Sequence, residues 1–153
     1  MFGLFSKKPE SHFSEEEKNK IVAAIQSAEQ KTSGEVRIYI ENKCAYVNPL
    51  HRAQELFFNL KMDQTAERNG VLVYIAMKDR QLAVFGDEGI HQKVGSAFWD
   101  QEVKKMLAEF RQLHYADGLA TIIEDIGVAL STHFPYDNKG DKNELPDEIV
   151  FGR

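Results

Sequence analysis

The sequence predicts an α/β fold: a three-layer α/β/α sandwich with a small mixed β-sheet, in which a parallel pair of strands is joined by an antiparallel hairpin strand. Two kinds of pattern lead to this prediction. Residues 35–41 alternate between polar and apolar side chains, and residues 70–77 are continuously apolar, as expected for strands with one and two covered faces. Before, between and after these strands, apolar residues recur at helical spacing.

Length, charge and cysteine content narrow the class of protein. The chain has 153 residues, 42% of them hydrophobic and 28% charged, which suits one globular domain. A net charge of −5 gives no basic surface for nucleic acid, and a single cysteine excludes an internal disulfide. No apolar run approaches the roughly 18 residues of a transmembrane segment, and Met1–Phe5 is too short for a signal-peptide core. We therefore expect a cytoplasmic protein without a transmembrane segment.

Four helices are predicted, over residues 14–32, 49–61, 96–110 and 117–133. The first begins with a capping box, Ser14–Glu17, in which a serine at the N-cap is followed three residues later by a glutamate. Pro49 suits the first position of the second helix. Ile90–Val94 is expected to form a short turn before the third helix, and Asp117 is expected to cap the last one.

Three strands are predicted, over residues 35–41, 70–77 and 81–86. The first two are joined through a helix, so we expect them to be parallel. The third follows the tight connection Lys78-Asp79-Arg80, which makes a hairpin and an antiparallel pair. The short apolar run Ile149–Phe151 could add an edge strand.

The chain divides into three segments by composition. Residues 1–13 are expected to be a flexible N-terminal segment, residues 14–135 an α/β/α domain, and residues 136–153 a polar C-terminal tail.

Common catalytic and cofactor motifs are absent. The sequence contains no glycine-rich phosphate loop, no dinucleotide fingerprint and no Gly-x-Ser-x-Gly motif. Cys44 has no arginine six positions later, as a cysteine-dependent phosphatase would need, and the five histidines lack zinc-protease spacing. We therefore expect no organic cofactor, and the catalytic residues of any activity stay unknown.

Isolated carboxylates remain, and strand order sorts them. Asp79 follows the second strand, whereas Asp87 and Glu88 follow the returning third strand and lie at the end where Glu35 begins the first. Asp79 and Asp87 should be on the order of 20 Å apart and cannot bind the same ion. The course of the last helices brings Asp117 to the end that holds Asp79.

Oxygen ligands of this kind suit calcium or magnesium. The predicted metal ligands are Asp87, Glu88, Glu35, Asp79 and Asp117, and the choice between the two ends is open. The alternative is that these acids cap helices and solvate turns. Further side chains at the two ends are Asp63, Glu67, Glu41, Asn42 and His114.

Several short segments together resemble the TPM domain family over about residues 14 to 135. They are Ser33–Arg37, Asn69–Val73, Asp79-Arg80, Gly86–Ile90 with Trp99, Tyr115–Leu119 and His133–Pro135. The resemblance implies a compact α/β/α sandwich and divalent-cation binding in an acidic groove. It also implies, for some members, acid phosphatase activity. The positions that match the family segments are Glu35, Asp79, Asp87 and Asp117.

Three hypotheses for function follow. The first is a divalent-cation-binding accessory or regulatory protein that acts through a protein partner. The second is a metal-dependent acid phosphatase of low turnover. The third is a protein-interaction module without cation or catalysis, which would use the apolar residues Phe2, Leu4 and Phe5 or the C-terminal tail.

Overall fold

The sheet has four strands in the order β3-β2-β1-β4. The strands are β1 (Glu35–Glu41), β2 (Gly70–Ala76), β3 (Gln81–Gly86) and β4 (Ile149–Phe151). β1 is parallel to both of its neighbours, β2 and β4, whereas β3 is antiparallel to β2. The computed structural model describes residues 8–136 and 149–153. It confirms the mixed sheet with its parallel pair and hairpin strand, and it adds β4 at the edge where one was expected.

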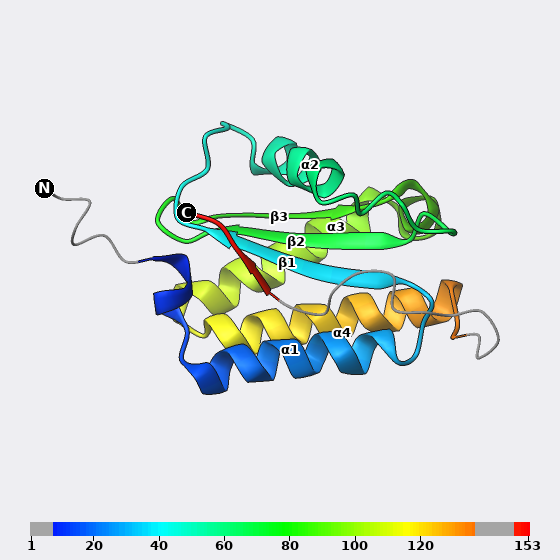
Figure 1. Ribbon diagram of the computed structural model, residues 1–153, viewed down its shortest axis with the longest axis horizontal. Helices are drawn as coiled ribbons and strands as arrows, with labels where there is room; N and C mark the ends of the chain where they lie inside the picture. The colour runs from blue at the N-terminus through cyan, green and yellow to red at the C-terminus, as the bar shows by residue number, and fades with distance from the viewer. Residues whose placement is uncertain (1–7, 137–148) are drawn as a thin grey trace, which may run out of the picture.

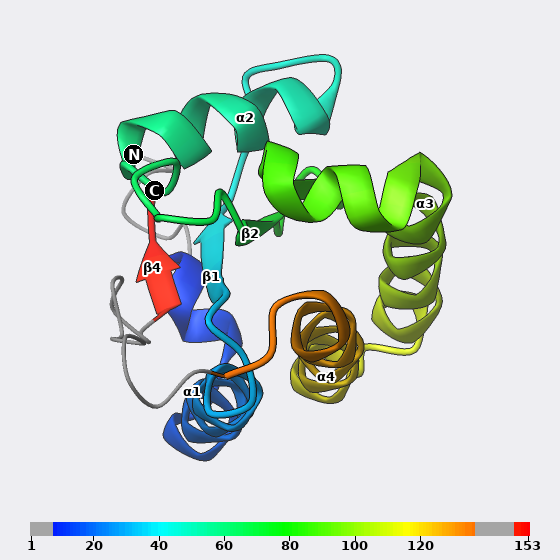
Figure 2. The same cartoon turned by 90° about the vertical axis from the view of Figure 1, so that its right-hand side faces the viewer.

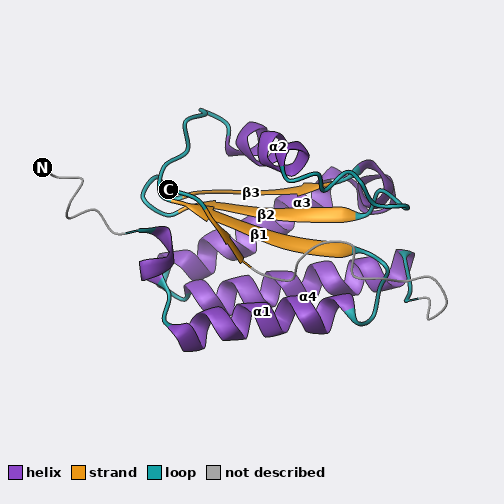
Figure 3. Ribbon diagram, viewed as in Figure 1, coloured by secondary structure: helices purple, strands orange, loops and turns teal. Residues whose placement is uncertain are grey.

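Helices cover both faces of the sheet and one of its edges (Figures 1 and 3). The helices are α1 (Glu15–Glu29), α2 (Pro49–Asn59), α3 (Glu88–Arg111) and α4 (Tyr115–His133). α2 packs on one face, α1 and α4 lie side by side on the other, and α3 runs beside β3 (Figure 2). The predicted α/β/α layering is therefore observed.

Each face of the sheet has its own hydrophobic core, because successive strand residues point to opposite sides. The core beneath α2 includes Phe57, Leu72, Tyr74 and Ala83. The larger core on the other face is built from β1, β2 and β3 together with α1, α3 and α4, and it includes Ile25, Val73, Val84, Trp99 and Ile126.

Two helices begin where the sequence predicts. Ser14 and Glu17 form the capping box of α1, with each side chain accepting a hydrogen bond from the other residue's backbone N–H at 3.0 and 2.9 Å. The Asn48 side chain accepts from the Leu50 backbone N–H at 2.9 Å and caps α2, with Pro49 in its first turn. The starts of α1 and α2 therefore both depend on local signals that can be recognised in the sequence.

The other two helix starts were predicted wrongly. α3 begins at Glu88, not at residue 96, because Asp87 is its N-cap and the region around Ile90 is helical; a break follows at Gly95, where φ is +77°. α3 consequently bends at this glycine (Figure 2). α4 begins at Tyr115, so Asp117 lies in its first turn and is not its cap.

The described part of the N-terminal segment is folded, in contrast to the flexible segment expected from the sequence. Pro9–His12 form a 3-10 helix, and the Phe13 side chain is buried. The Phe13 ring lies 6.4 Å from the rings of both Tyr115 and Phe151, measured between centroids. Residues 1–7, with the Phe2, Leu4 and Phe5 patch, and residues 137–148 of the tail lie outside the described residues.

Candidate functional site

A groove of about 740 Å³ runs along β3 between α2 and α3. This volume is within the roughly 300–1,000 Å³ that is typical of ligand sites. We call it the β3 groove, and it is lined by Asn48, Pro49, Leu50, Phe58, Arg68, Leu82, Ala83, Val84, Phe85, Gly86, Asp87, Glu88, His91, Ser96, Trp99, Asp100, Val103 and Lys104.

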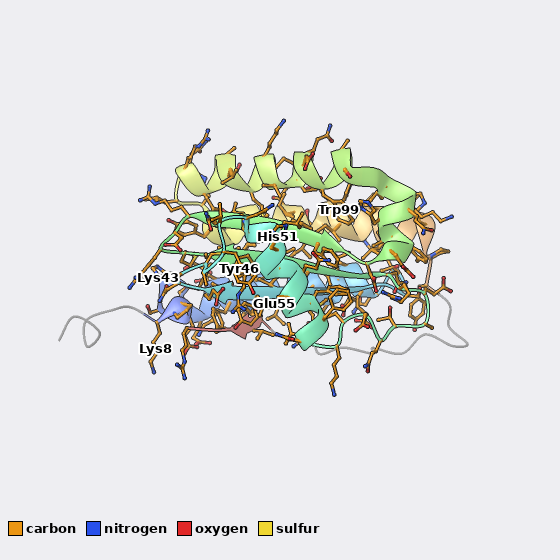
Figure 4. All side chains as sticks on the ribbon, turned by 90° about the horizontal axis from the view of Figure 1, so that it is seen from above. Lys8, Lys43, Tyr46, His51, Glu55 and Trp99 are labelled. Carbon is orange, nitrogen blue, oxygen red and sulfur yellow. The ribbon has the colours of Figure 1, made fainter. Side chains whose placement is uncertain are left out.

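Apolar side chains form the two walls of the β3 groove. From α2, Leu50 and Phe58 are 41% and 44% exposed, and both line the groove. From α3, Trp99 lies between its helix and the strands (Figure 4), and its indole N–H donates to His91 Nδ1 at 3.0 Å. A Cβ on Gly86 would come within 2.3 Å of the Trp99 ring, so only glycine allows this close packing.

At one end of the groove, Arg68 neutralises the two acids that begin α3. Its guanidinium binds the Asp87 carboxylate through two hydrogen bonds, of 2.7 and 2.8 Å, and reaches Glu88 at 3.2 Å. The Asp87 side chain is only 3% exposed and also accepts from the Glu88 backbone N–H at 2.8 Å. These carboxylates raise the pKa of Arg68, so it stays charged at any working pH.

Glu35 lies at the same end of the sheet as Asp87, as predicted. Gly70, the first residue of β2, pairs with Glu35 of β1. On the side toward β3, its carbonyl accepts a hydrogen bond from the Asp87 backbone N–H. The two acidic residues therefore lie on strands either side of β2, about 10 Å apart along the sheet. Glu35 is buried at this end, with 2% exposure.

Asp79 lies at the opposite end of the sheet, beside Asn42, as predicted. Its backbone N–H donates to the Asn42 carbonyl at 3.2 Å, and its carboxylate accepts from the Cys44 backbone N–H at 2.7 Å. The β2–β3 register leaves the two ends separated by a full strand length, so Asp79 and Asp87 cannot share an ion. In the structure Asp79 fixes the backbone of the loop that follows β1.

Asp117 lies at the Asp79 end and is paired with α1, the neighbouring helix on the same face of the sheet. Its carboxylate accepts a hydrogen bond from the Lys20 ammonium on α1. This cation lowers the pKa of Asp117. Both side chains are more than half exposed, so the pair adds little to stability.

The described residues bring no three of His, Cys, Asp and Glu into a group that could hold a metal ion. The five predicted ligands are divided between the two ends of the sheet, and three of them pair with Arg68 or Lys20.

A partly buried ion-pair network at the Asp79 end of the sheet was not predicted from the sequence. Arg52 on α2 binds the Glu41 carboxylate with two hydrogen bonds, of 2.9 and 3.0 Å, and also binds Glu55 at 2.5 Å. The Tyr74 hydroxyl donates to Glu41, and the Tyr46 hydroxyl donates to Glu55. Burial and the Glu41 carboxylate raise the pKa of Tyr74, so it remains a neutral donor.

The sequence of this chain matches a known protein family. The model of the TPM domain matches residues 7–129 of the sequence. The chain belongs to the TPM domain family. Its resemblance to that family, expected from the short sequence segments, is thereby confirmed.

Solved structures agree with this assignment. This TPM domain is similar to the NMR structure of the BA42 protein from the psychrophilic bacterium Bizionia argentinensis, with 39% identity, a TM-score of 0.81, and coverage of 90% of this chain and 94% of that one. Two more distant NMR structures share the fold. The N-terminal domain of the cg2496 protein from Corynebacterium glutamicum is 17% identical, with a TM-score of 0.59 and coverage of 85% and 78%. The N-terminal domain of a P. gingivalis protein is 15% identical, with a TM-score of 0.58 and coverage of 82% and 83%. No curated protein matches the sequence.

No helix among the described residues of this TPM domain is long and apolar enough to cross a membrane.

Sequence reasoning missed the β3 groove and Arg68. The sequence did contain one signal for the groove. The predicted third strand pairs on one side with the second strand, and its other edge is free unless a further strand covers it. For Arg68 the signal is weaker. It precedes Asn69-Gly70 at the entry to β2, and only the left-handed backbone at Arg68, with φ of +51°, turns its side chain toward Asp87.

The buried acid Glu102 makes the stability of this TPM domain depend on pH. The Glu102 side chain on α3 is 4% exposed and faces Lys105 at 3.6 Å and Asp125 of α4, which Lys105 binds at 2.9 Å. Burial, then the neighbouring Asp125, raises the pKa of Glu102 to about 7. A raised carboxyl pKa favours the protonated folded state, so stability should fall as pH rises from 5.5 to 8.

Replacing Glu102 with glutamine should remove this pH dependence, because glutamine does not ionise. We expect the variant's advantage over wild type in free energy of unfolding to be larger at pH 8 than at pH 5.5 by about 1–2 kcal/mol, because wild-type stability is lost between the ordinary carboxyl pKa and the raised folded-state pKa of about 7. Urea unfolding at the two pH values measures the difference. Asp100→Asn, on the exposed side of the same helix, is the matched control and should leave the pH dependence unchanged. A Glu102→Gln protein with the wild-type pH profile would contradict the assignment.

Proposed function

We propose that this chain is an accessory domain that binds a segment of a protein partner in the β3 groove. The supporting observation is that Leu50 and Phe58 expose large apolar surfaces to a groove whose opposite wall is Trp99. Exposed aromatic and aliphatic side chains that converge on a concave surface are typical of binding sites for peptides and proteins. A protein partner was also common to two of the three hypotheses drawn from the sequence.

Calcium or magnesium binding remains a prediction beside this proposal. An ion at Asp87 and Glu88 would have to displace or tolerate Arg68, which already supplies a positive charge and three hydrogen bonds to these acids. An ion at Asp79 would compete with the Cys44 backbone N–H. A calcium titration followed by backbone NMR would test both ends together.

Acid phosphatase activity and a cytoplasmic location also remain predictions. Phosphoryl transfer needs positive charge at the phosphate and a positioned nucleophile. Arg68 is the cation in the wall of the groove nearest the predicted acids, and it is held by Asp87. The geometry therefore favours binding of a partner over phosphoryl transfer as the use of this groove.

Selection from a displayed library of random seven-residue peptides tests the proposed function. We expect enrichment on the immobilised wild-type chain, and at least about tenfold less on Phe58→Glu, because a carboxylate in the apolar wall would be desolvated by a bound peptide. Val128→Glu is the matched control, since Val128 is 65% exposed on α4 in another layer. Thermal melts check that both variants are folded.

Enrichment that is equal on wild type and Phe58→Glu would contradict the proposal, as would an absence of enrichment above blank support. Loss of enrichment on Val128→Glu as well would also count against the β3 groove.

A further inference from the structure

We infer that the β3 groove takes its occupant as an added β-strand: an extended partner segment that pairs antiparallel with the free edge of β3 and carries a basic and an acidic side chain two residues apart. This inference rests on the proposed function and names the chemistry of the partner.

The outer edge of β3 lies in the groove and pairs with no other described strand, and its residues Leu82 and Val84 are 6% and 3% exposed. In an antiparallel pair, alternate residues bond to the partner strand and the residues between them point away. The Asp87 N–H donates to the Gly70 carbonyl at 2.9 Å, so the residues whose backbone groups bond to β2 are those an even number of positions from Asp87. Leu82, Val84 and Gly86 are an odd number of positions from Asp87, so their N–H and C=O groups point outward. Among the described residues, no strand pairs with this edge.

β3 lines the groove together with α2 and α3, so a strand added to the outer edge of β3 would continue the sheet between these two helices. Neighbouring strands lie about 4.8 Å apart, which places the added backbone directly beside Leu82 and Val84. A second copy of this chain fits poorly, because two edges that each lie between helices cannot approach to that distance.

Charge on α3 specifies part of the occupant. Asp100 and Lys104 are both exposed and both line the groove, and neither forms an ion pair with any other residue in the described ranges. They are one helical turn apart, about 6 Å along the axis. Side chains at alternate positions of a strand are about 6.6 Å apart and point to the same face. An extended segment can therefore offer one basic and one acidic side chain to this pair at once.

The direction of α3 fixes the order of these charges. α3 returns along β3 from the end where β3 finishes (Figure 1), and Trp99 packs on Gly86, so Asp100 lies nearer that end than Lys104, which follows one helical turn later. A segment antiparallel to β3 passes Asp100 first and Lys104 second. Its pattern is then basic–apolar–acidic, with the central apolar side chain directed toward Phe58 and Leu50 on α2. Antiparallel pairing is chosen because it is the more stable ladder per residue.

Binding of the synthetic peptide acetyl-Val-Lys-Val-Glu-Val-amide, labelled with a fluorophore, tests the inference. We expect it to bind wild type at least about tenfold more tightly than the same peptide with lysine and glutamate exchanged, since the exchange puts like charges in contact. The double variant Asp100→Lys/Lys104→Asp should invert this preference. A variant that is unfolded or has lost the groove would bind neither peptide. An inverted preference therefore shows charge recognition by a folded protein.

Backbone methylation tests the strand pairing separately. N-methylation of the lysine and glutamate removes the N–H groups that face β3 and should weaken binding at least about tenfold. N-methylation of the central valine alters an N–H that faces away, and should be tolerated.

Equal binding of the two charge orders, or equal effects of the two methylation patterns, would overturn the inference. A dimer of this chain in sedimentation that dissociates in the Asp100→Lys/Lys104→Asp variant would overturn it as well. If library peptides bind through Phe58 but none responds to charge exchange or methylation, the inference of an added strand is wrong and the proposed function stands. If no peptide depends on Phe58 for binding, the inference and the proposed function are both wrong.

Discussion

Replacement of Arg52 with methionine is expected to destabilise the fold by about 3–5 kcal/mol, because it leaves the carboxylate of Glu41 buried without its cation. The Glu41 side chain is 9% exposed, and Arg52 satisfies it with two hydrogen bonds of 2.9 and 3.0 Å. The Tyr74 hydroxyl would remain as a donor but supplies no charge. Methionine keeps most of the length of the arginine side chain, so loss of packing contributes little.

Urea unfolding at pH 7 measures this loss, and two further variants interpret it. Lys20→Met breaks an ion pair whose two side chains are 53% and 62% exposed, and it should change stability far less than Arg52→Met. The double variant Arg52→Met/Glu41→Gln should recover part of the loss, because it removes the unpaired charge. Similar costs for Arg52→Met and Lys20→Met would contradict the burial argument.

Replacement of Arg68 with methionine is the second large effect, because it leaves the buried carboxylate of Asp87 without its cation. The Asp87 side chain is 3% exposed and receives two hydrogen bonds from Arg68. We expect a smaller loss of stability than for Arg52→Met, because Arg68 itself is 38% exposed and Asp87 keeps the bond from the Glu88 backbone N–H. Urea unfolding at pH 7 measures the loss.

Glu88→Gln is the matched control for Arg68, since it removes only the exposed member of the same cluster. The Glu88 side chain is 63% exposed, and we expect a change within about 1 kcal/mol. Calcium at millimolar concentration adds a second measurement. If a cation can bind at this end, it should stabilise Arg68→Met more than wild type, because it can replace the lost charge beside Asp87. A cost for Glu88→Gln equal to that of Arg68→Met would contradict this account.

The elements of this fold follow mainly from local patterns. Alternation in β1, the apolar run of β2 and the capping box at Ser14 each depend on residues within one segment, and each element was predicted correctly. Both faces of β1 are buried, however, whereas one covered face was expected. The start of α3 was missed because Ile90–Val94 was interpreted as a short turn before the helix. Gly89 is helical: a Cβ there would come within 2.2 Å of the Glu67 carbonyl oxygen, so the helix can approach that loop only at a glycine.

The candidate site was predictable only in part, for a related reason. Strand order correctly separated Asp79 from Asp87, because it depends on the direction of the chain alone. The partners of these acids could not be deduced in the same way. Arg68 reaches Asp87 across 19 residues, and Lys20 reaches Asp117 across 97. Such pairings depend on tertiary packing and leave no periodic pattern in the sequence.

The position of β4 has a consequence for the order of folding. Ile38 on β1 pairs with Ile149 on β4, 111 residues later in the chain, whereas β2 and β3 are joined by four residues, Met77 to Arg80. Closure of a long loop costs entropy that is regained only when the strands meet, so contacts distant in sequence tend to form late. One edge of β1 therefore stays open while the β2–β3 hairpin and the helices assemble. During that interval β1, like β3, has an edge that is open to pairing with another unfolded chain, and β4 later closes the edge of β1.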